Sequence, residues 1–235
     1  MPIDDLKILK ISGTAIPVIG DNIDTDQITP ADAMTETSFA NAVHYLFRDA
    51  RSADPNHSLN DSRYNGASIM IVNKNFGSGS SRETAPQAIA RYGIKALVGE
   101  SYAAIFEGNC RALGIPAVAT SSDDIKRIME FTENSPQTPY TLDLESMVVI
   151  YRSPRKFSKY FIEKLPASLD KMPPYFTRLL TFLLYKKNNV NVSMPESSRK
   201  ALMEGQWDAL SMLKANEGMV KEVAGRLPYM NGFAN

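Results

Sequence analysis

The chain is poor in the residues that bind metals through sulfur or nitrogen. Its 235 residues include one cysteine, Cys110, and two histidines, His44 and His57. A single thiol excludes a disulfide within the chain, and an iron–sulfur cluster needs several thiolates, so this chain alone does not hold one. The same shortage argues against a structural zinc site. Cys110 falls in a helical pattern, and we interpret it as a buried core thiol rather than a reactive one.

The sequence also lacks an excess of either charge and lacks long apolar runs. Lysine plus arginine and aspartate plus glutamate both number 26, so the charge balance gives no indication of a nucleic-acid partner. The longest apolar stretch, residues 179–185, is too short to cross a bilayer. The first residues carry no apolar signal region. We therefore expect a cytoplasmic protein that binds neither nucleic acid nor membrane.

Apolar periodicity predicts alternating strands and helices in the middle of the chain. Three short apolar runs are typical of strands, and a helical pattern follows each of them. In chain order, strands and helices alternate over the ranges 67–72, 83–92, 94–99, 102–113, 115–119 and 123–131. This order is typical of an α/β layered domain with parallel strand pairs.

The flanking segments complete the expected organisation. The remaining predictions are one or two strands in 6–18, a helix over 39–47, a polar loop over 51–66, a strand pair over 140–151 and a helix over 195–213. Residues 164–192 contain Pro166, Pro173 and Pro174 before an apolar stretch. We predict a short helix or strand there, in an insertion or a poorly ordered segment.

The most informative stretch joins the predicted strand at 67–72 to the predicted helix at 83–92. It reads Asn73-Lys-Asn-Phe-Gly-Ser-Gly-Ser-Ser-Arg-Glu-Thr-Ala-Pro-Gln87. Gly77 and Gly79 allow the backbone to approach a ligand closely. The unpaired N–H groups of a helix start and the fork of Arg82 both favour a negative charge. The stretch therefore predicts a binding site for a small anion.

Three other interpretations of this stretch fail on particular residues. A Walker A loop needs a lysine after its last glycine, and a dinucleotide fingerprint needs a third glycine where this chain has Arg82. A nucleophile elbow needs a glycine where Glu83 stands. A capping box, in which Ser80 accepts a hydrogen bond from the Glu83 N–H group, stays open beside the anion site.

A second polar constellation reads Gly20-Asp-Asn-Ile-Asp-Thr-Asp-Gln-Ile-Thr-Pro30. Its acids and amides suggest calcium, but the EF-hand template fails. Counted from Asp24, the sixth position is not glycine and the twelfth is Thr35. A plain turn stabilised by Asx side chains remains the alternative.

Together these two segments resemble the small-subunit family of the 3-isopropylmalate dehydratases (isopropylmalate isomerases), within the aconitase superfamily. The resemblance continues through Gly99-Glu-Ser-Tyr-Ala, Ile105-Phe-Glu-Gly-Asn-Cys110 and Arg199-Lys-Ala-Leu-Met-Glu-Gly-Gln-Trp-Asp208. It implies a swivelling β/β/α domain of the aconitase type with a partly parallel central sheet. That domain would comprise residues 1–163 and 193–235, with 164–192 as an insertion or a poorly ordered segment.

The resemblance also implies an activity that this chain performs only with a partner. The family is a lyase of leucine biosynthesis, and its large subunit carries a four-iron four-sulfur cluster. The implied site residues are Ser80 as the base and Ser81, Arg82, Thr25, Asp26 and Thr35 as substrate-binding residues. The substrate is a dicarboxylate, by default an isopropylmalate, and the expected assembly is a heterodimer.

One loop departs from the family pattern. Residues 31–37 read Ala-Asp-Ala-Met-Thr-Glu-Thr, where relatives carry aromatic and basic residues that contact the variable part of the substrate. Here Ala33 and Thr35 are small and uncharged, and Asp32 adds an acid. Two alternatives therefore stay open: a paralogue acting on another alkylmalate or a homoaconitate-like diacid, and a non-catalytic regulatory subunit.

Overall fold

The computed structural model describes residues 6–35, 39–79, 82–154, 185–208 and 216–227. Within them lie two four-stranded sheets. The parallel sheet has the order β2 (Ala15–Val18), β3 (Ile69–Val72), β4 (Ala96–Gly99) and β5 (Ala117–Ala119). The antiparallel sheet has the order β1 (Lys10–Gly13), β6 (Tyr140–Asp143), β7 (Val148–Pro154) and β8 (Tyr185–Asn191). The predicted strands and parallel pairs are confirmed.

Successive side chains of a strand point to opposite faces of a sheet, and both faces of the parallel sheet are buried. On β3, Met70 belongs to one hydrophobic core and its neighbour Ile69 belongs to the other. On β4, Leu97 and Val98 divide in the same way. Two layers must therefore cover this sheet, one on each face.

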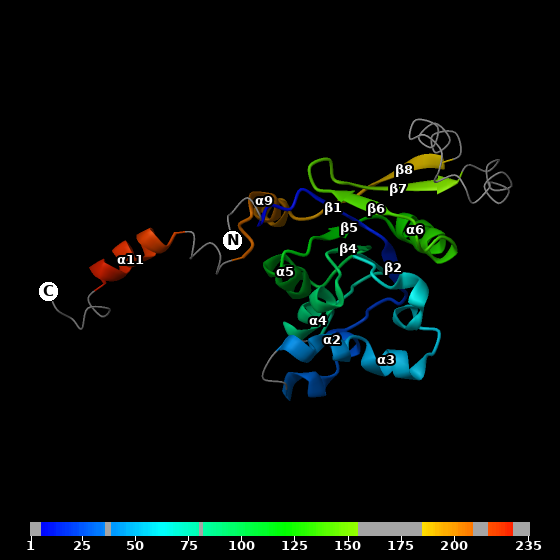
Figure 1. The fold of residues 1–235 in the computed structure, drawn as a ribbon, viewed down its shortest axis with the longest axis horizontal. Helices are drawn as coiled ribbons and strands as arrows, with labels where there is room; N and C mark the ends of the chain where they lie inside the picture. Colours follow the sequence, from blue (N-terminus) through cyan, green and yellow to red (C-terminus); the bar gives the residue numbers. More distant parts are fainter. Residues whose placement is uncertain (1–5, 36–38, 80–81, 155–184, 209–215, 228–235) are drawn as a thin grey trace, which may run out of the picture.

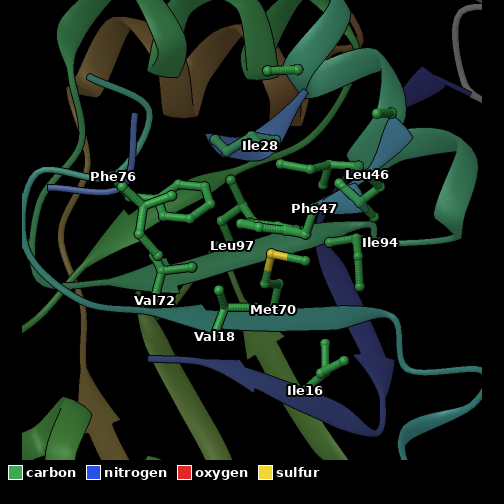
Figure 2. Packing of buried hydrophobic residues seen from close by; sticks show 14 of the residues in the cluster. Ile16, Val18, Ile28, Leu46, Phe47, Met70, Val72, Phe76, Ile94 and Leu97 are labelled. Atoms are coloured by element: carbon green, nitrogen blue, oxygen red, sulfur yellow. The ribbon is translucent and has the colours of Figure 1, made fainter. Parts of the chain in front are cut away.

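Helices cover the first face. These are α2 (Ala42–Tyr45), α3 (Arg48–Ala53), α4 (Thr84–Tyr92) and α5 (Ala104–Ala112). Figure 1 shows them on the side of the parallel sheet that faces away from the antiparallel strands. Figure 2 shows Met70 and Val72 of β3 in one cluster with Leu46 and Phe47, which lie between α2 and α3.

The antiparallel sheet and α6 (Ser122–Asn134) cover the second face (Figure 1). The core on this side joins Ile71 of the parallel sheet to Leu142 and Val149 of the antiparallel sheet and to Ile125 of α6. The Ser121 side chain caps the start of α6 by accepting a hydrogen bond from the Asp124 N–H group. Sheet, sheet and helices therefore form the three layers of a β/β/α architecture.

Two predictions for the segment before β3 were wrong in detail. The predicted helix over 39–47 is divided into the 3₁₀ helix η3 (Phe39–Asn41) and α2, and ends because Phe47 takes a left-handed φ of 50° while its ring is buried. The predicted polar loop over 51–66 contains the second half of α3 and the 3₁₀ helices η4 (Ser58–Asn60) and η5 (Ser62–Tyr64). Side chains of His57 and Asp61 cap these short turns, a local effect that apolar periodicity does not reveal.

The last described segments are α9 (Glu196–Glu204) and α11 (Glu217–Arg226). The predicted helix over 195–213 ends earlier than expected, because Gly205 terminates α9 with a φ of 72°. Residues 185–191 form β8, whereas 155–184 lie outside the described residues, so the boundaries at 164 and 192 stay a prediction. Among the helices that the structure describes, none is long and apolar enough to span a bilayer.

Candidate active site

The candidate site lies where three neighbouring parallel strands end. The segments that leave the carboxyl ends of β2, β3 and β4 carry both polar motifs noted in the sequence. The first segment includes the short helix α1 (Thr25–Ile28), and the second leads into α4. The carboxyl edge of a parallel sheet is the usual place for a ligand in α/β proteins. The sheet topology therefore brings together residues that are about fifty positions apart in the chain.

Backbone hydrogen bonds join the loop after β2 to the loop after β3. The Gly77 N–H group donates to Ile23 O at 2.8 Å, and the Thr25 N–H group donates to Ser78 O at 2.8 Å. These bonds continue the pairing of β2 and β3 beyond the ends of the strands. The two loops therefore have a fixed register at this edge.

The loop after β4 holds the other side of the central loop. The Asn75 N–H group donates to Ser101 Oγ at 2.9 Å, and the Phe76 N–H group donates to Ser101 O at 3.1 Å. In return, the Ala103 N–H group donates to Phe76 O at 3.0 Å. The loop of residues 73–79 is thus held between its two neighbours.

A buried aromatic pair fixes the conformation of the loop of residues 73–79 from the side of the core. Phe76 is fully buried and points into the core, as Figure 2 shows, and its ring meets Phe106 of α5 edge-on at a centroid distance of 5.4 Å. Gly77 follows with a φ of 76°, and a Cβ atom there would lie 2.1 Å from Phe106 Cγ. Only glycine fits this position, because a side chain would meet both backbone strain and the ring.

The start of α1 is built by a capping box. The Asp24 side chain accepts a hydrogen bond from the Gln27 N–H group, and the Gln27 side chain accepts one from the Asp24 N–H group. Thr25 is buried, and Gly79, with a φ of 91°, passes close enough that an added Cβ would lie 3.5 Å from Thr25 Oγ1. The sequence left a plain Asx turn as the alternative once the EF-hand template had failed, and the structure shows a helix start capped by the Asp24 side chain.

Arg82 and Asp26 form an ion pair across the two loops. The Arg82 side chain is only 12% exposed, whereas that of Asp26 is 51% exposed. Arg82 Nη1 is buried and makes no hydrogen bond of standard geometry to the described residues, so its partner there is the facing Asp26 carboxylate. The arrangement places a cation at the carboxyl edge of the sheet, oriented by an acid from the neighbouring loop.

Comparisons with known proteins identify the family. Residues 6–122 match the Aconitase C-terminal domain. The chain is 34% identical over 226 residues to the 3-isopropylmalate dehydratase small subunit of Synechocystis sp., a match that covers 96% of each chain. It is 36% identical over 227 residues to the same subunit of Thermus thermophilus, covering 95% of this chain and 96% of the relative. The chain belongs to the 3-isopropylmalate dehydratase small-subunit family.

A solved structure agrees on the fold of this family. The 3-isopropylmalate dehydratase of Methanocaldococcus jannaschii superimposes with a TM-score of 0.58 at 19% sequence identity, covering 91% of this chain and 99% of that one. The predicted fold, an α/β domain of the aconitase swivelling type with a partly parallel sheet, is confirmed. The resemblance that the sequence motifs indicated is confirmed with it.

The structure brings together three of the six site residues expected for a member of this family. Thr25 and Asp26 lie on α1, and Arg82 reaches Asp26 from the next loop. Ser80 and Ser81 lie outside the described residues. Thr35 is the last residue of the 3₁₀ helix η2 (Ala31–Thr35), and the structure describes its backbone alone. Their roles stay predictions.

The helix after the motif begins one residue later than predicted, at Thr84, with Glu83 at the N-cap position. The Glu83 side chain accepts a hydrogen bond from Gln87 Nε2 at 3.1 Å, one turn further on. A Ser80 cap would belong to a helix starting earlier than α4 does, and the proposed bond from Glu83 to Ser80 lies outside the described residues. The capping-box interpretation gains no support from the observed helix start.

Asp32 is the acid in the loop at 31–37, which departs from the family pattern, and it pairs with an arginine of another segment. Arg48 of α3 contacts it with both terminal nitrogens, Nη1 to Oδ2 at 2.6 Å and Nη2 to Oδ1 at 3.1 Å. The hydrogen bonds from Arg48 hold the pKa of Asp32 below its usual value. The negative charge that the sequence assigned to the loop is therefore balanced by a guanidinium.

Among the described residues, no three His, Cys, Asp or Glu side chains come together as metal ligands. Cys110 of α5 is fully buried in the core that lies between the helices and the parallel sheet. Burial raises the pKa of its thiol far above the usual range, and the Glu107 carboxylate adds to this effect. A neutral thiol in this position is a packing group, as the sequence predicted.

Sequence reasoning missed a contact between two residues beside the candidate site. Asn22 and Asn75 both have a left-handed φ of 56°, and the Asn75 Nδ2 donates to Asn22 Oδ1 at 3.0 Å. Asparagine is one of the few residues that tolerates this conformation, so its presence in both motifs was an available signal. The sequence alone does not show that the two side chains are in contact.

Proposed function

We propose that this chain is the small subunit of a heteromeric hydro-lyase that converts 2-isopropylmalate to 3-isopropylmalate in leucine biosynthesis. Family membership over 95% or more of the chain supports the reaction. The observation that carries the site is the Arg82–Asp26 pair at the carboxyl edge of the parallel sheet. The partner is the large subunit, and we place the enzyme in the cytoplasm, as expected for amino-acid biosynthesis.

Arg82 binds a carboxylate of the substrate. A guanidinium carries five N–H donors in a planar fork that matches a carboxylate with two parallel hydrogen bonds. Asp26 holds the Nη1 side of this fork. Because Asp26 is an acid, it repels a dicarboxylate, and its role is to orient Arg82 rather than to contact substrate directly. Thr25 and Ser81 add hydroxyl donors to the same edge.

Ser80 is the base of the proposed reaction. It takes the proton from the carbon next to the hydroxyl-bearing carbon, the hydroxyl group leaves, and a carbon–carbon double bond forms. The proton and the leaving hydroxyl group depart together as one water; a water then adds back, its hydroxyl to the carbon that lost the proton and its proton to the carbon that lost the hydroxyl, so the hydroxyl has migrated. A serine accepts a proton only if its alkoxide is stabilised by nearby positive charge, which Arg82 and the start of α4 provide.

The cluster that the family uses does not fit this chain. The one thiol of the chain, Cys110, is buried in the core between the helices and the parallel sheet, whereas Arg82 lies at the carboxyl edge of that sheet. We therefore assign the four-iron four-sulfur cluster to the large subunit, where it supplies a Lewis acid for the leaving hydroxyl. Each subunit provides half of the site.

The loop at 31–35 favours a second candidate, a related alkylmalate as substrate. The 3₁₀ helix η2 has no basic residue, and Ala33 is buried. Since Arg48 balances Asp32, the loop offers neither a free acid nor a cation to the substrate's variable group. An uncharged substituent suits such a loop.

The test is reconstitution. This chain is co-expressed with the large subunit from the same source, and formation of the unsaturated diacid is followed by absorbance with 2- and 3-isopropylmalate and smaller alkylmalates. We expect turnover of isopropylmalate that is lost, by at least about a thousandfold, in Ser80→Ala, since a base has been removed. Unchanged turnover in that variant would remove Ser80 from the mechanism, and a large subunit fully active alone would favour a regulatory role.

A further inference from the structure

The loops that carry Asp26 and Arg82 meet through a pair of asparagine side chains. Asn22 lies two residues before the cap of α1, and Asn75 lies seven residues before Arg82. The Asn75 Nδ2 donates to Asn22 Oδ1 at 3.0 Å across the gap between the loops. The bond spans 53 positions of sequence, so it reports on tertiary arrangement and not on local turn formation.

Both asparagines hold an uncommon backbone conformation. Each has a φ of 56°, where a residue with a side chain is disfavoured unless it is asparagine or aspartate. Glycine would adopt this conformation without strain, and the same two loops use it at Gly20, Gly77 and Gly79, all with positive φ. Tolerance of the turn therefore does not explain why both of these positions carry an amide.

The pair is poorly suited to a role in stability alone. Asn22 is exposed and Asn75 is half-buried, and an exposed hydrogen bond between neutral groups contributes little to folding. The position of the pair between the two loops is more informative. The backbone bonds from Gly77 to Ile23 and from Thr25 to Ser78 follow directly, between the asparagines and α1.

We propose that Asn22 and Asn75 are positioning residues that fix the register of the two loops and so set the orientation of Arg82 against Asp26. This role rests on the proposed function of the Arg82 edge. At the strand end the amide pair joins the loops beside the Asn22 N–H bond to Lys74 O and the Gly20 N–H bond to Asn73 Oδ1, and the Arg82–Asp26 ion pair joins them at the proposed ligand end. A shift of the loops by a fraction of an ångström at the first contact displaces the guanidinium at the second, and such misplacement lowers turnover strongly.

Glycine variants separate this role from simple turn formation. Asn22→Gly and Asn75→Gly keep the left-handed backbone without strain and remove only the amide contact. In the reconstituted complex we expect each to lower kcat about tenfold while KM changes less than about twofold, because substrate still finds Arg82 but in a less ordered orientation. The double variant should be no worse than either single one, since both remove the same bond. Asn22→Asp keeps an acceptor for Asn75 Nδ2 and should recover most of the turnover.

A second measurement needs neither substrate nor partner. In the free chain, hydrogen exchange of the Gly77 and Thr25 amides should be about tenfold faster in the double glycine variant, while amides of β3 and β4 stay unchanged. Asn60→Ala is the control, because the Asn60 amide bonds to Arg51 O and Asp54 O within its own segment. Asn60→Ala should change neither the turnover of the complex nor the exchange of the Gly77 and Thr25 amides.

The outcomes are distinct. Full activity of both glycine variants, or unchanged exchange at Gly77 and Thr25, overturns the positioning role. If the wild-type complex does not dehydrate isopropylmalate, the proposed function fails, and the exchange measurement still decides whether the pair sets the register of the loops.

Discussion

The loops at the carboxyl edge of the parallel sheet and the hairpin between β6 and β7 use similar residues for different purposes. In the hairpin, Met147 has a left-handed φ of 52°, and Asp143 accepts hydrogen bonds from the Glu145 and Ser146 N–H groups at 2.9 and 3.1 Å. Lys10 of β1 then pairs with the same carboxylate at 3.1 Å.

An arginine also contacts each region, but the two arginines have different kinds of partner. Arg199 of α9 donates to the hairpin carbonyls of Leu144 at 2.8 Å and Glu145 at 3.0 Å, so its fork is used by backbone. The Arg82 side chain is more buried than that of Arg199, and among the described residues it pairs with one acid, Asp26. The hairpin satisfies its polar groups with its own N–H groups and with Lys10 and Arg199 from neighbouring elements, whereas Arg82 at the edge loops pairs with one acid, as a proposed carboxylate-binding group should. This difference separates a structural turn from a site.

The largest effect is expected from adding a methyl group to the central loop. Gly77→Ala combines the strain of a positive φ with a collision against the buried Phe106 ring. Together these cost about 2–5 kcal/mol of unfolding free energy. Chemical denaturation of the free chain measures it. Gly66→Ala is the matched control, because Gly66 has a similar φ of 80° and nothing within 4 Å of an added Cβ. Equal losses in the two variants would show that the Phe106 contact does not matter.

The next effect concerns the two arginines. Arg82→Lys keeps the charge but loses the planar fork, so we expect kcat/KM of the reconstituted complex to fall about a hundredfold with little change in stability. Arg199→Lys removes hydrogen bonds to the hairpin and should lower the unfolding free energy by about 1 kcal/mol while leaving kcat/KM unchanged. Activity loss in the second variant, or none in the first, would contradict the division between site and hairpin.

The sequence predicted the fold well where apolar periodicity decides it. The strands at 67–72 and 94–99 and the helix between them were placed within about two residues, because a buried parallel sheet demands continuous apolar runs. It failed at Phe47, where a tertiary contact buries the ring and breaks a helical pattern. Of the motif residues, Asp26 and Arg82 meet in an ion pair, whereas the site roles of Thr25, Asp26 and Arg82 stay predictions.

The rest of the site depends on contacts between distant segments, which one sequence does not display. Nothing in the letters pairs Asn22 with Asn75, or Asp32 with Arg48, because each contact is created by the way the strands align. Asp26 was predicted to bind substrate, and this role stays a prediction; the orienting role that we propose for it rests on its ion pair with Arg82. Residues 80 and 81 lie outside the described part of the chain, so the assignments of Ser80 and Ser81 still rest on the motif.

The smallest effect is expected from the hairpin acid, and it depends on pH. Burial of Asp143 raises its pKa, but hydrogen bonds from the Ser146 and Glu145 N–H groups and the contact with Lys10 outweigh burial, so the folded pKa lies below the usual value of 3.8. A lowered folded pKa means that the stabilisation is complete above about pH 4 and is lost as the pH falls through the folded value. Asp143→Asn should therefore lower the unfolding free energy by about 1 kcal/mol at pH 7 and bring the variant closer to the wild type below about pH 4. Urea denaturation across pH 2–7 measures this convergence, and turnover of the reconstituted complex at pH 7 should not change, since the hairpin lies outside the site. A stability difference that stayed constant down to pH 2 would show that the Asp143 charge does not stabilise the turn, and a loss of turnover would place the hairpin within reach of the site.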